Sequence, residues 1–168
     1  MTERDDAAPT IRLSDYRPPA WRVRSAELVF ELDAELTEVE ATLELEADPQ
    51  QPSQPLRLDG EALELLEIAL DGIPLPASRY LLDAHALTIT GVSGACRLRT
   101  RARIRPRLNT RLEGLYASGG SLLTQCEAEG FRRITWYVDR PDVSARFRVT
   151  LRGDRAHYPV LLSNGNPD

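Results

Sequence analysis

The feature that most constrains this chain is an alternation of apolar and charged residues with a period of two. It runs through residues 28–32, breaks at a turn near residues 34–37 and resumes over residues 38–46. Such a period places alternate side chains on opposite faces of a strand, so both segments predict half-buried antiparallel strands. The apolar members are Leu28, Phe30, Leu32, Val39, Ala41, Leu43 and Leu45, and the glutamates of the second segment are Glu38, Glu40, Glu44 and Glu46.

A third alternating segment, residues 96–105, carries arginine at every second position. Such a row could bind the phosphates of a nucleic acid. The row contains no aromatic residue, however, and the chain is acidic overall. We therefore favour a structural interpretation, in which glutamates of neighbouring strands neutralise the arginines across the sheet, and we expect no nucleic-acid partner.

The rest of the chain favours short strands joined by turns. Residues 61–70 have high helix propensity, but they are short and bounded by Asp-Gly turn pairs, so we predict a strand. Residues 114–124 predict a hairpin that turns at Gly119-Gly120, and Pro141 suits the first position of a short helix near residues 141–146. Further strands are predicted at residues 56–58, 73–75, 87–90, 147–151 and 160–162.

These elements together predict an all-β fold, a mostly antiparallel, saddle-like β-sandwich with one short helix. The length of 168 residues suits a single domain. Residues 1–20 are polar and contain prolines, so we expect an extended N-terminal arm, anchored by Ile11, Leu13 and Tyr16. The β domain would then occupy residues 21–168.

Charge and composition exclude several functions. The formal net charge of −5 gives no general attraction to nucleic acids or anionic membranes. All 21 basic residues are arginine, which excludes mechanisms that need a lysine amine, such as Schiff-base chemistry. No apolar run has the length of a signal peptide or a membrane span, so we expect a cytoplasmic protein with no membrane partner.

The chain contains two cysteines and two histidines, residue types that often act as nucleophiles or metal ligands. Cys96 and Cys126 form no Cys-x-x-Cys pair, and we expect both to be ordinary thiols, with Cys126 facing the core. His85 and His157 form no His-x-x-x-His pair, which argues against a metal site. Neither histidine is close in sequence to a cysteine, which argues against a catalytic thiol.

Three polar residues at alternate positions, Gln125, Glu127 and Glu129, form the strongest candidate site. If the segment is extended, all three side chains point to one face. That face would combine hydrogen-bonding capacity with negative charge, which suits a cation such as an amino group. From the residues alone, a solvated strand face explains the same pattern.

The same stretch resembles a known family. Thr-Gln-Cys-Glu-Ala-Glu-Gly-Phe-Arg at residues 124–132 resembles the signature of the N-terminal domain of bacterial aminopeptidase N, a zinc-dependent exopeptidase of the gluzincin class. The likeness is loosest before residue 56 and between residues 71 and 108. Further segments similar to the family follow in order at residues 56–61, 112–119, 134–147 and 158–166.

This resemblance implies a domain of a larger enzyme that removes N-terminal amino acids from peptides. It implies that Glu127 binds the free α-amino group of the substrate and that Gln125 lines the S1 site. It also implies that the domain packs on a catalytic domain of the same polypeptide. Glu129 has no such implied role, and we expect it to be structural, paired with Arg132 or Arg133.

The zinc motif of the family, His-Glu-x-x-His with a distant glutamate, does not occur in this sequence, and neither does Gly-Ala-Met-Glu-Asn. We therefore expect a fragment, truncated before the last strands of its domain, with the zinc of the full-length enzyme bound elsewhere. On its own, this fragment would have no catalytic residue, no cofactor and no peptidase activity. Unpaired strand edges could join two copies into a dimer. The alternative is a stand-alone β-sandwich that binds a protein or a small cationic ligand and catalyses nothing.

Overall fold

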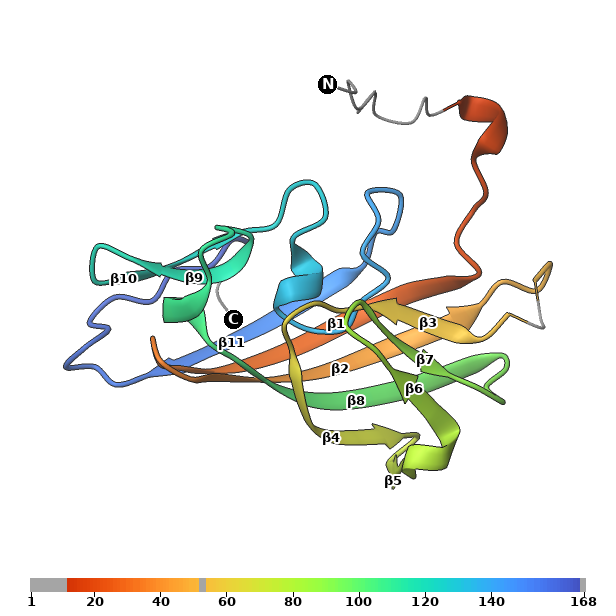
Figure 1. Ribbon diagram of the computed structural model, residues 1–168, viewed down its shortest axis with the longest axis horizontal. Coiled ribbons are helices and arrows are strands. Elements are labelled where there is room, and N and C mark those ends of the chain that lie inside the picture. Colours follow the sequence, from red (N-terminus) through yellow and green to blue (C-terminus); the bar gives the residue numbers. More distant parts are fainter. Residues whose placement is uncertain (1–11, 52–53, 167–168) are drawn as a thin grey trace, which may run out of the picture.

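The computed structural model describes residues 12–51 and 54–166. Its largest element is a curved six-stranded sheet with the strand order β11-β1-β2-β8-β4-β5, and two small sheets accompany it (Figure 1). The strands of the large sheet are β1 (Trp21–Leu32), β2 (Thr37–Ala47), β4 (Glu64–Leu70), β5 (Ile73–Pro74), β8 (Ala95–Ile104) and β11 (Arg146–Gly153). The small sheets consist of β3 (Leu56–Asp59), β7 (Ala86–Ile89) and β6 (Tyr80–Leu82), and of β9 (Gly114–Ser118) and β10 (Ser121–Gln125).

The three long strands β1, β2 and β8 are antiparallel neighbours whose apolar residues face one another across the sheet. Leu43 of β2 lies opposite Ala26 of β1 on one side and opposite Leu98 of β8 on the other. All three side chains are buried. The period-two pattern thus predicted both the strands and their antiparallel pairing, because only this register buries the apolar face of all three strands together.

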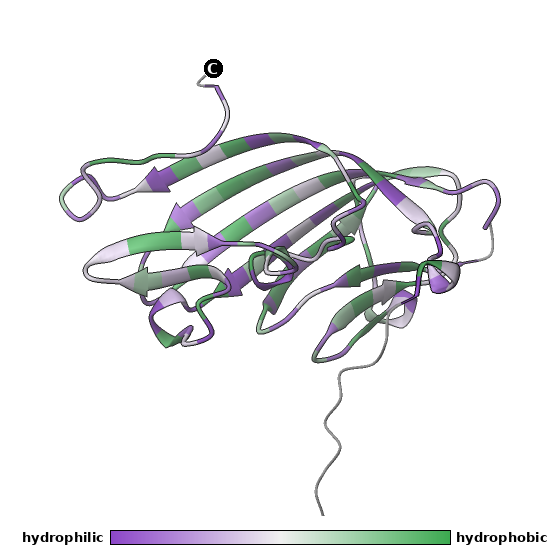
Figure 2. Cartoon of the chain, turned by 90° about the horizontal axis from the view of Figure 1, so that it is seen from above, coloured by the Kyte–Doolittle hydropathy of each residue, from purple (hydrophilic) through white to green (hydrophobic). Residues whose placement is uncertain are grey.

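Both small sheets lie on the same side of the large sheet, which curves over them (Figure 2). One part of the core lies between the large sheet and β3-β7, where Leu45, Leu58 and Leu87 pack with Trp136. A second part of the core contains Leu115 of β9. The predicted all-β, saddle-like sandwich is therefore confirmed, and its concave side carries the core.

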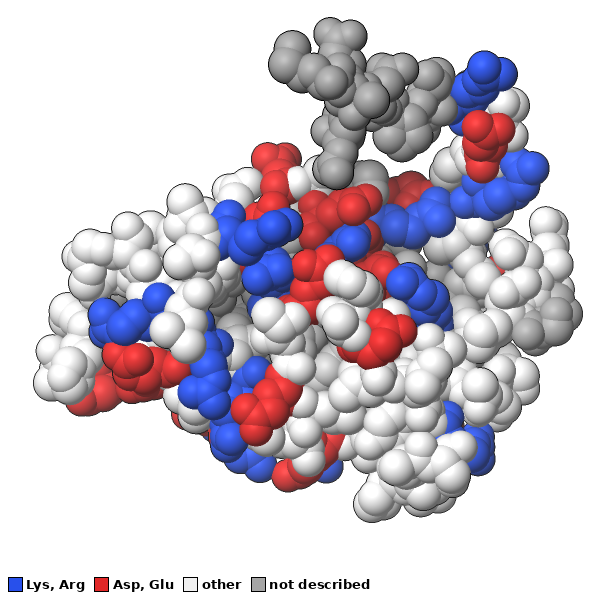
Figure 3. Space-filling view, viewed as in Figure 1, with Lys and Arg blue, Asp and Glu red and all other residues white. Residues whose placement is uncertain are grey.

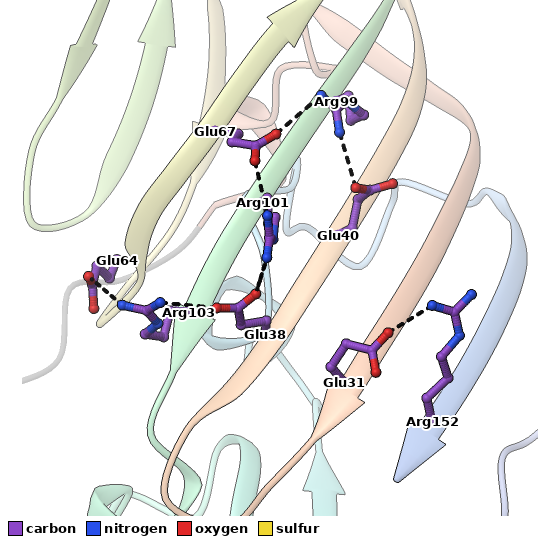
Figure 4. A network of polar contacts seen from close by, with 9 residues as sticks. All are labelled: Glu31, Glu38, Glu40, Glu64, Glu67, Arg99, Arg101, Arg103 and Arg152. Atoms are coloured by element: carbon purple, nitrogen blue, oxygen red, sulfur yellow. Dashed lines mark hydrogen bonds and ion pairs between the residues drawn. The ribbon is translucent and has the colours of Figure 1, made fainter.

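The opposite face of the large sheet carries the predicted ladder of arginines and glutamates (Figure 4). Arg101 of β8 bridges Glu38 of β2, at 2.5 Å, and Glu67 of β4, at 3.0 Å. Its neighbours Arg99 and Arg103 likewise pair with glutamates of both flanking strands. Figure 3 views the molecule from the other side, where the small sheets lie, and there too acidic and basic side chains are interleaved. The structural interpretation of the arginine row is confirmed.

Three predictions about the later part of the chain are wrong or incomplete. The helix near residues 141–146 is only a turn, in which the Val143 amide donates to the Arg140 carbonyl at 3.1 Å, and β11 begins at Arg146. Residues 160–162 form no strand. Strand β11 was predicted, but its parallel pairing with β1 was not. Within the described residues, the helical segments are four 3-10 turns: η1 (Leu13–Asp15), η2 (Ala77–Arg79), η3 (Pro106–Leu108) and η4 (Phe131–Arg133).

The expected N-terminal arm is only partly described, since residues 1–11, with Ile11, lie outside the described part. Of the other two expected anchors, Leu13 is 91% exposed and anchors nothing. Tyr16 does make a contact, because its hydroxyl donates to Asp142 Oδ2 at 3.0 Å. This contact fastens the arm to the turn that precedes β11.

Candidate functional site

Gln125 is the last residue of the β9-β10 hairpin. The hairpin turns at Gly119 and Gly120, whose φ angles of 57° and 83° explain why glycines occupy the turn. The register then places Gln125 opposite Gly114. The predicted hairpin is confirmed, and the Gln125 side chain, at the end of the hairpin away from its turn, is exposed.

The chain does not continue as a strand beyond Gln125, so the prediction that Gln125, Glu127 and Glu129 share one strand face is wrong. Residues 127–130 form a turn, closed by a hydrogen bond of 2.9 Å from the Gly130 amide to the Cys126 carbonyl. The Glu127–Ala128 peptide bond within it is cis. Glu127 lies at the tip of this turn rather than on a sheet.

Two glycines allow the turn to fold back against the hairpin. A Cβ atom on Gly130 would lie 2.7 Å from the Gln125 carbonyl oxygen, a backbone atom that cannot move aside freely. A Cβ atom on Gly114 would lie 2.8 Å from Arg133 Cβ, and the φ of Gly114 is +73°. Glycine is therefore required at both positions by close approach, and at Gly114 also by backbone conformation.

The two acids of the turn differ in their surroundings. Glu129 pairs with Arg132 at 3.0 Å, as its predicted structural role requires. Glu127 is exposed, and its carboxylate makes no ion pair or hydrogen bond with the residues that the structure describes. The amide of Gln125 reaches the Glu127 backbone carbonyl only at 3.5 Å. Among the described residues, the site therefore presents the unpaired carboxylate of Glu127 next to the side-chain amide of Gln125, which makes only this one long hydrogen bond.

A buried ion pair lies directly behind the turn. Asp139, 6% exposed, accepts hydrogen bonds on Oδ2 from the Arg132 backbone amide and from Arg132 Nε, at 3.0 and 2.9 Å. Sequence reasoning did not single out Asp139. The signal that it leaves is a lone acid at the end of the apolar run 134–138, since an acid in such a place must be buried with a partner.

Two further ionisable groups near the site, the Cys126 thiol and the Tyr137 hydroxyl, are neutral at physiological pH. Burial, together with a smaller contribution from nearby Asp139, raises the pKa of the Cys126 thiol to about 11. Burial likewise raises the pKa of Tyr137 to about 12, again with a contribution from Asp139. Cys126 is half-buried and packs against the second part of the core, as predicted. Neither group is suited to act as a nucleophile or a base here.

The described residues do not fit a zinc site. Across residues 12–51 and 54–166, no three His, Cys, Asp or Glu side chains are placed to hold a metal ion. The imidazole of His85 lies 3.8 Å from Glu61 and that of His157 lies 2.7 Å from Asp154, so each imidazole lies within ion-pair distance of one acid. The described part of the chain also contains no helix long and apolar enough to cross a membrane.

The fold is one that zinc metallopeptidases carry. Aminopeptidase A of Legionella pneumophila, solved in complex with aspartic acid, matches with a TM-score of 0.84 and 30% identity over 92% of this chain and 18% of its own. An M1 zinc metallopeptidase from Deinococcus radiodurans, solved as a mutant bound to a Tyr-Ser-Ala substrate, matches with a TM-score of 0.68 and 19% identity. That match covers 80% of this chain and 33% of the Deinococcus chain.

The chain belongs to the Peptidase M1 N-terminal domain family, which it matches over residues 22–168. It is 46% identical to aminopeptidase N of Caulobacter vibrioides, over 98% of this chain and 19% of that protein. It is 44% identical to aminopeptidase N of Escherichia coli K12, over 90% of this chain and 17% of that protein. The chain thus spans less than a fifth of the length of either relative.

Proposed function

We propose that this chain is the amine-recognition domain of a zinc aminopeptidase that removes N-terminal amino acids from peptides. Glu127 binds the α-ammonium group of the substrate, and Gln125 lines the S1 site beside it. The observation that carries this proposal is the Glu127 carboxylate, held at the tip of a closely packed turn and unpaired among the described residues. Family membership supports it, because an exopeptidase must recognise a free amino terminus.

The chemistry of the two side chains suits these roles. A carboxylate that accepts a hydrogen bond from an ammonium group stabilises it by roughly 1.5–3 kcal/mol when water is kept away. Glu127 is exposed in this chain, so such a contact needs a second surface to cover it. The catalytic domain of the same polypeptide would supply this surface. Three leucines of the segment that leads into the site are exposed and offer apolar area for the contact: Leu108, Leu112 and Leu123.

Zinc belongs, in this proposal, to the full-length enzyme, where it would activate the water that attacks the peptide bond. Because the described residues provide no ligand set for zinc, we expect the isolated chain to be inactive towards aminoacyl-arylamides with or without the metal. A cytoplasmic location is part of the same proposal, and cell fractionation would test it.

A chimera tests the role of Glu127. Residues 1–168 would replace the corresponding part of the Caulobacter aminopeptidase N, so that the relative supplies the remaining domains. Replacing the carboxylate in Glu127→Gln should lower kcat/KM for an aminoacyl-arylamide about 10- to 100-fold, mainly through a higher KM, because one charge-assisted hydrogen bond to the substrate amine is lost. The measurement is steady-state kinetics of the purified, zinc-loaded chimera.

The matched control is Glu31→Gln, which makes the same chemical change on β1, where Glu31 pairs with Arg152 at 2.8 Å. This control should leave KM and kcat unchanged. An active chimera whose KM does not respond to Glu127→Gln would refute the proposed role. Equal losses in both variants would also refute it, because they would show a general effect of removing an acid.

A further inference from the structure

Arg132 links the turn that carries Glu127 to a buried part of the chain. Its Nε and backbone amide both donate to Asp139 Oδ2, and its terminal Nη2 donates to the Asp139 carbonyl at 2.9 Å. The same Nη2 lies 3.0 Å from Glu129 Oε2. The Arg132 side chain is only 20% exposed. One guanidinium therefore joins a buried acid on one side to an acid of the turn on the other.

The Asp139 side of this link is fixed to the sheet. The Asp139 amide donates to Asp59 Oδ2 at 3.3 Å, and Asp59, at the end of β3, exchanges two backbone hydrogen bonds with Tyr137, at 2.7 and 3.0 Å. The Arg132 carbonyl accepts a further bond of 2.9 Å from the Glu61 amide, just after β3. Hydrogen bonds to β3 and to the residues that follow it therefore hold both Asp139 and the Arg132 backbone in place.

The turn side of the link has fewer constraints. Within residues 127–130, the Gly130 amide donates to the Cys126 carbonyl and closes the turn, and the Gly130 carbonyl accepts from the Arg133 amide at 3.1 Å. Glu129 makes an ion pair with Arg132. Among the residues that the structure describes, the Glu129–Arg132 pair is the only ion pair between a side chain of the turn and the rest of the molecule. Glu127 lies two residues before Glu129 in the same turn.

We propose that Arg132 is a positioning residue for substrate binding. Asp139 holds Arg132, and Arg132 in turn holds Glu129. The turn is thereby fixed so that the Glu127 carboxylate lies where it binds the substrate amine. This inference rests on the proposed function of Glu127. Arginine suits the role because its planar fork engages two acids at once in fixed geometry, which a lysine ammonium cannot reproduce. A displacement of about 1 Å at a binding group can cost a reaction roughly 100-fold.

Three variants test the inference in the chimera described above. Arg132→Met removes both links, and Arg132→Lys keeps the charge but loses the fork. Glu129→Gln breaks only the exposed link and leaves the buried pair intact, so it remains informative if Arg132→Met fails to fold. The control is Arg152→Met, which breaks the Arg152–Glu31 pair at the far edge of the sheet.

We expect KM to rise about tenfold in Arg132→Met and less in Arg132→Lys and Glu129→Gln, with a smaller change in kcat. A purely structural role would instead lower the active fraction, and hence kcat, at constant KM. Each variant is also combined with Glu127→Ala. If Arg132 acts through Glu127, its effect on KM disappears in that background; a KM effect that persists there, or no effect in the single variants, overturns the inference.

Nuclear magnetic resonance of the 168-residue chain provides a second readout that needs no catalysis. The heteronuclear 15N–1H Overhauser effects of residues 127–130 should fall in Arg132→Met and Glu129→Gln and remain unchanged in Arg152→Met. Unchanged values in all variants would show that the turn does not depend on Arg132. If Glu127→Ala alone leaves KM unchanged, the proposed function fails, while this measurement still decides whether Arg132 holds the turn.

Discussion

Cys96 and Cys126 illustrate how position in the fold determines the chemistry of a single residue. Burial and, to a smaller extent, nearby carboxylates raise the pKa of each thiol to about 11; the carboxylates are Asp71 and Glu44 for Cys96, and Asp139 for Cys126. At pH 8 only about one thiol in a thousand is then ionised, compared with about a quarter at the ordinary pKa near 8.5. Since the thiolate is the reactive form, both cysteines are chemically quiet, in agreement with the ordinary thiols that we predicted.

We therefore expect the folded chain to react with iodoacetamide at pH 8 at least about tenfold more slowly than the same chain unfolded in guanidinium. The rate should increase steeply as the pH approaches 11. Mass spectrometry of samples quenched over time measures the rate, and Cys96→Ser assigns it to one thiol. Rapid, stoichiometric modification of the native chain at pH 7 would contradict the expected burial of the thiols.

Glu127 shows what the sequence can and cannot reveal about the site. The alternation of Gln125, Glu127 and Glu129 suggested a shared face, and the residue types suggested a preference for a cation, which stays a prediction. The geometry was wrong because the segment leaves the strand after Gln125. The turn follows from the close approach of Gly130 to the Gln125 carbonyl, a contact between segments that no period in the sequence encodes. The role of Glu127 came from the family resemblance rather than from the pattern.

At the scale of the strand, the ion-pair ladder gives a prediction about acid stability. Hydrogen bonds from Arg101, and then from Arg103, hold the pKa of Glu38 below its ordinary value. A depressed pKa means that the folded state favours the ionised carboxylate. The resulting stability is complete above the unfolded pKa of about 4.3 and is lost as the pH falls through the lower, folded pKa.

Glu38→Gln should accordingly lower the free energy of unfolding by up to about 1 kcal/mol at pH 7. Its difference from the unmodified chain should shrink as the pH falls below about 4, where the carboxylate of the unmodified chain also becomes neutral. Urea unfolding at a series of pH values measures this. Because the ladder faces solvent, 1 M salt should reduce the difference at pH 7, and a difference that stays constant down to pH 2 would contradict the electrostatic origin.

The strands were largely predictable because period-two patterns record which face of a sheet is buried. Residues 61–70 became a strand despite their helix propensity, because β4 pairs with β8 and buries Ile68 and Ala69. The helix predicted near residues 141–146 does not form, because contacts made on either side of it require a turn and then an extended chain. Arg140 uses Asp142 as an ion partner, and the chain must be extended by Arg146 to run parallel to β1. Sequence patterns describe single strands well, but they do not say which distant strand becomes the neighbour.

At the scale of the whole molecule, one group of exposed apolar residues lies in the C-terminal part of the chain. Phe147 and Val149 of β11 are 51% and 37% exposed, and the segment 160–162 is largely exposed as well. Strand β11 is the last in the strand order of the large sheet, so no described strand pairs with its outer edge. Apolar residues alternate with arginines along β11, and exposed apolar side chains on an edge strand favour contact with another chain.

We therefore expect the 168-residue chain to self-associate through β11, with a light-scattering mass that rises with concentration from 18.8 kDa towards twice that value. Val149→Lys should restore the monomer, because it places a charge among the exposed apolar side chains of β11, where burial against a second copy would desolvate it. Ile73→Lys provides the matched control: it places the same charge on β5, at the opposite edge of the sheet, where Ile73 is 70% exposed. If β11 is the contact, only Val149→Lys changes the mass. Equal effects of both variants would assign the association to general hydrophobic contact, and a strict monomer at millimolar concentration would show that the edge of β11 is protected within the chain itself.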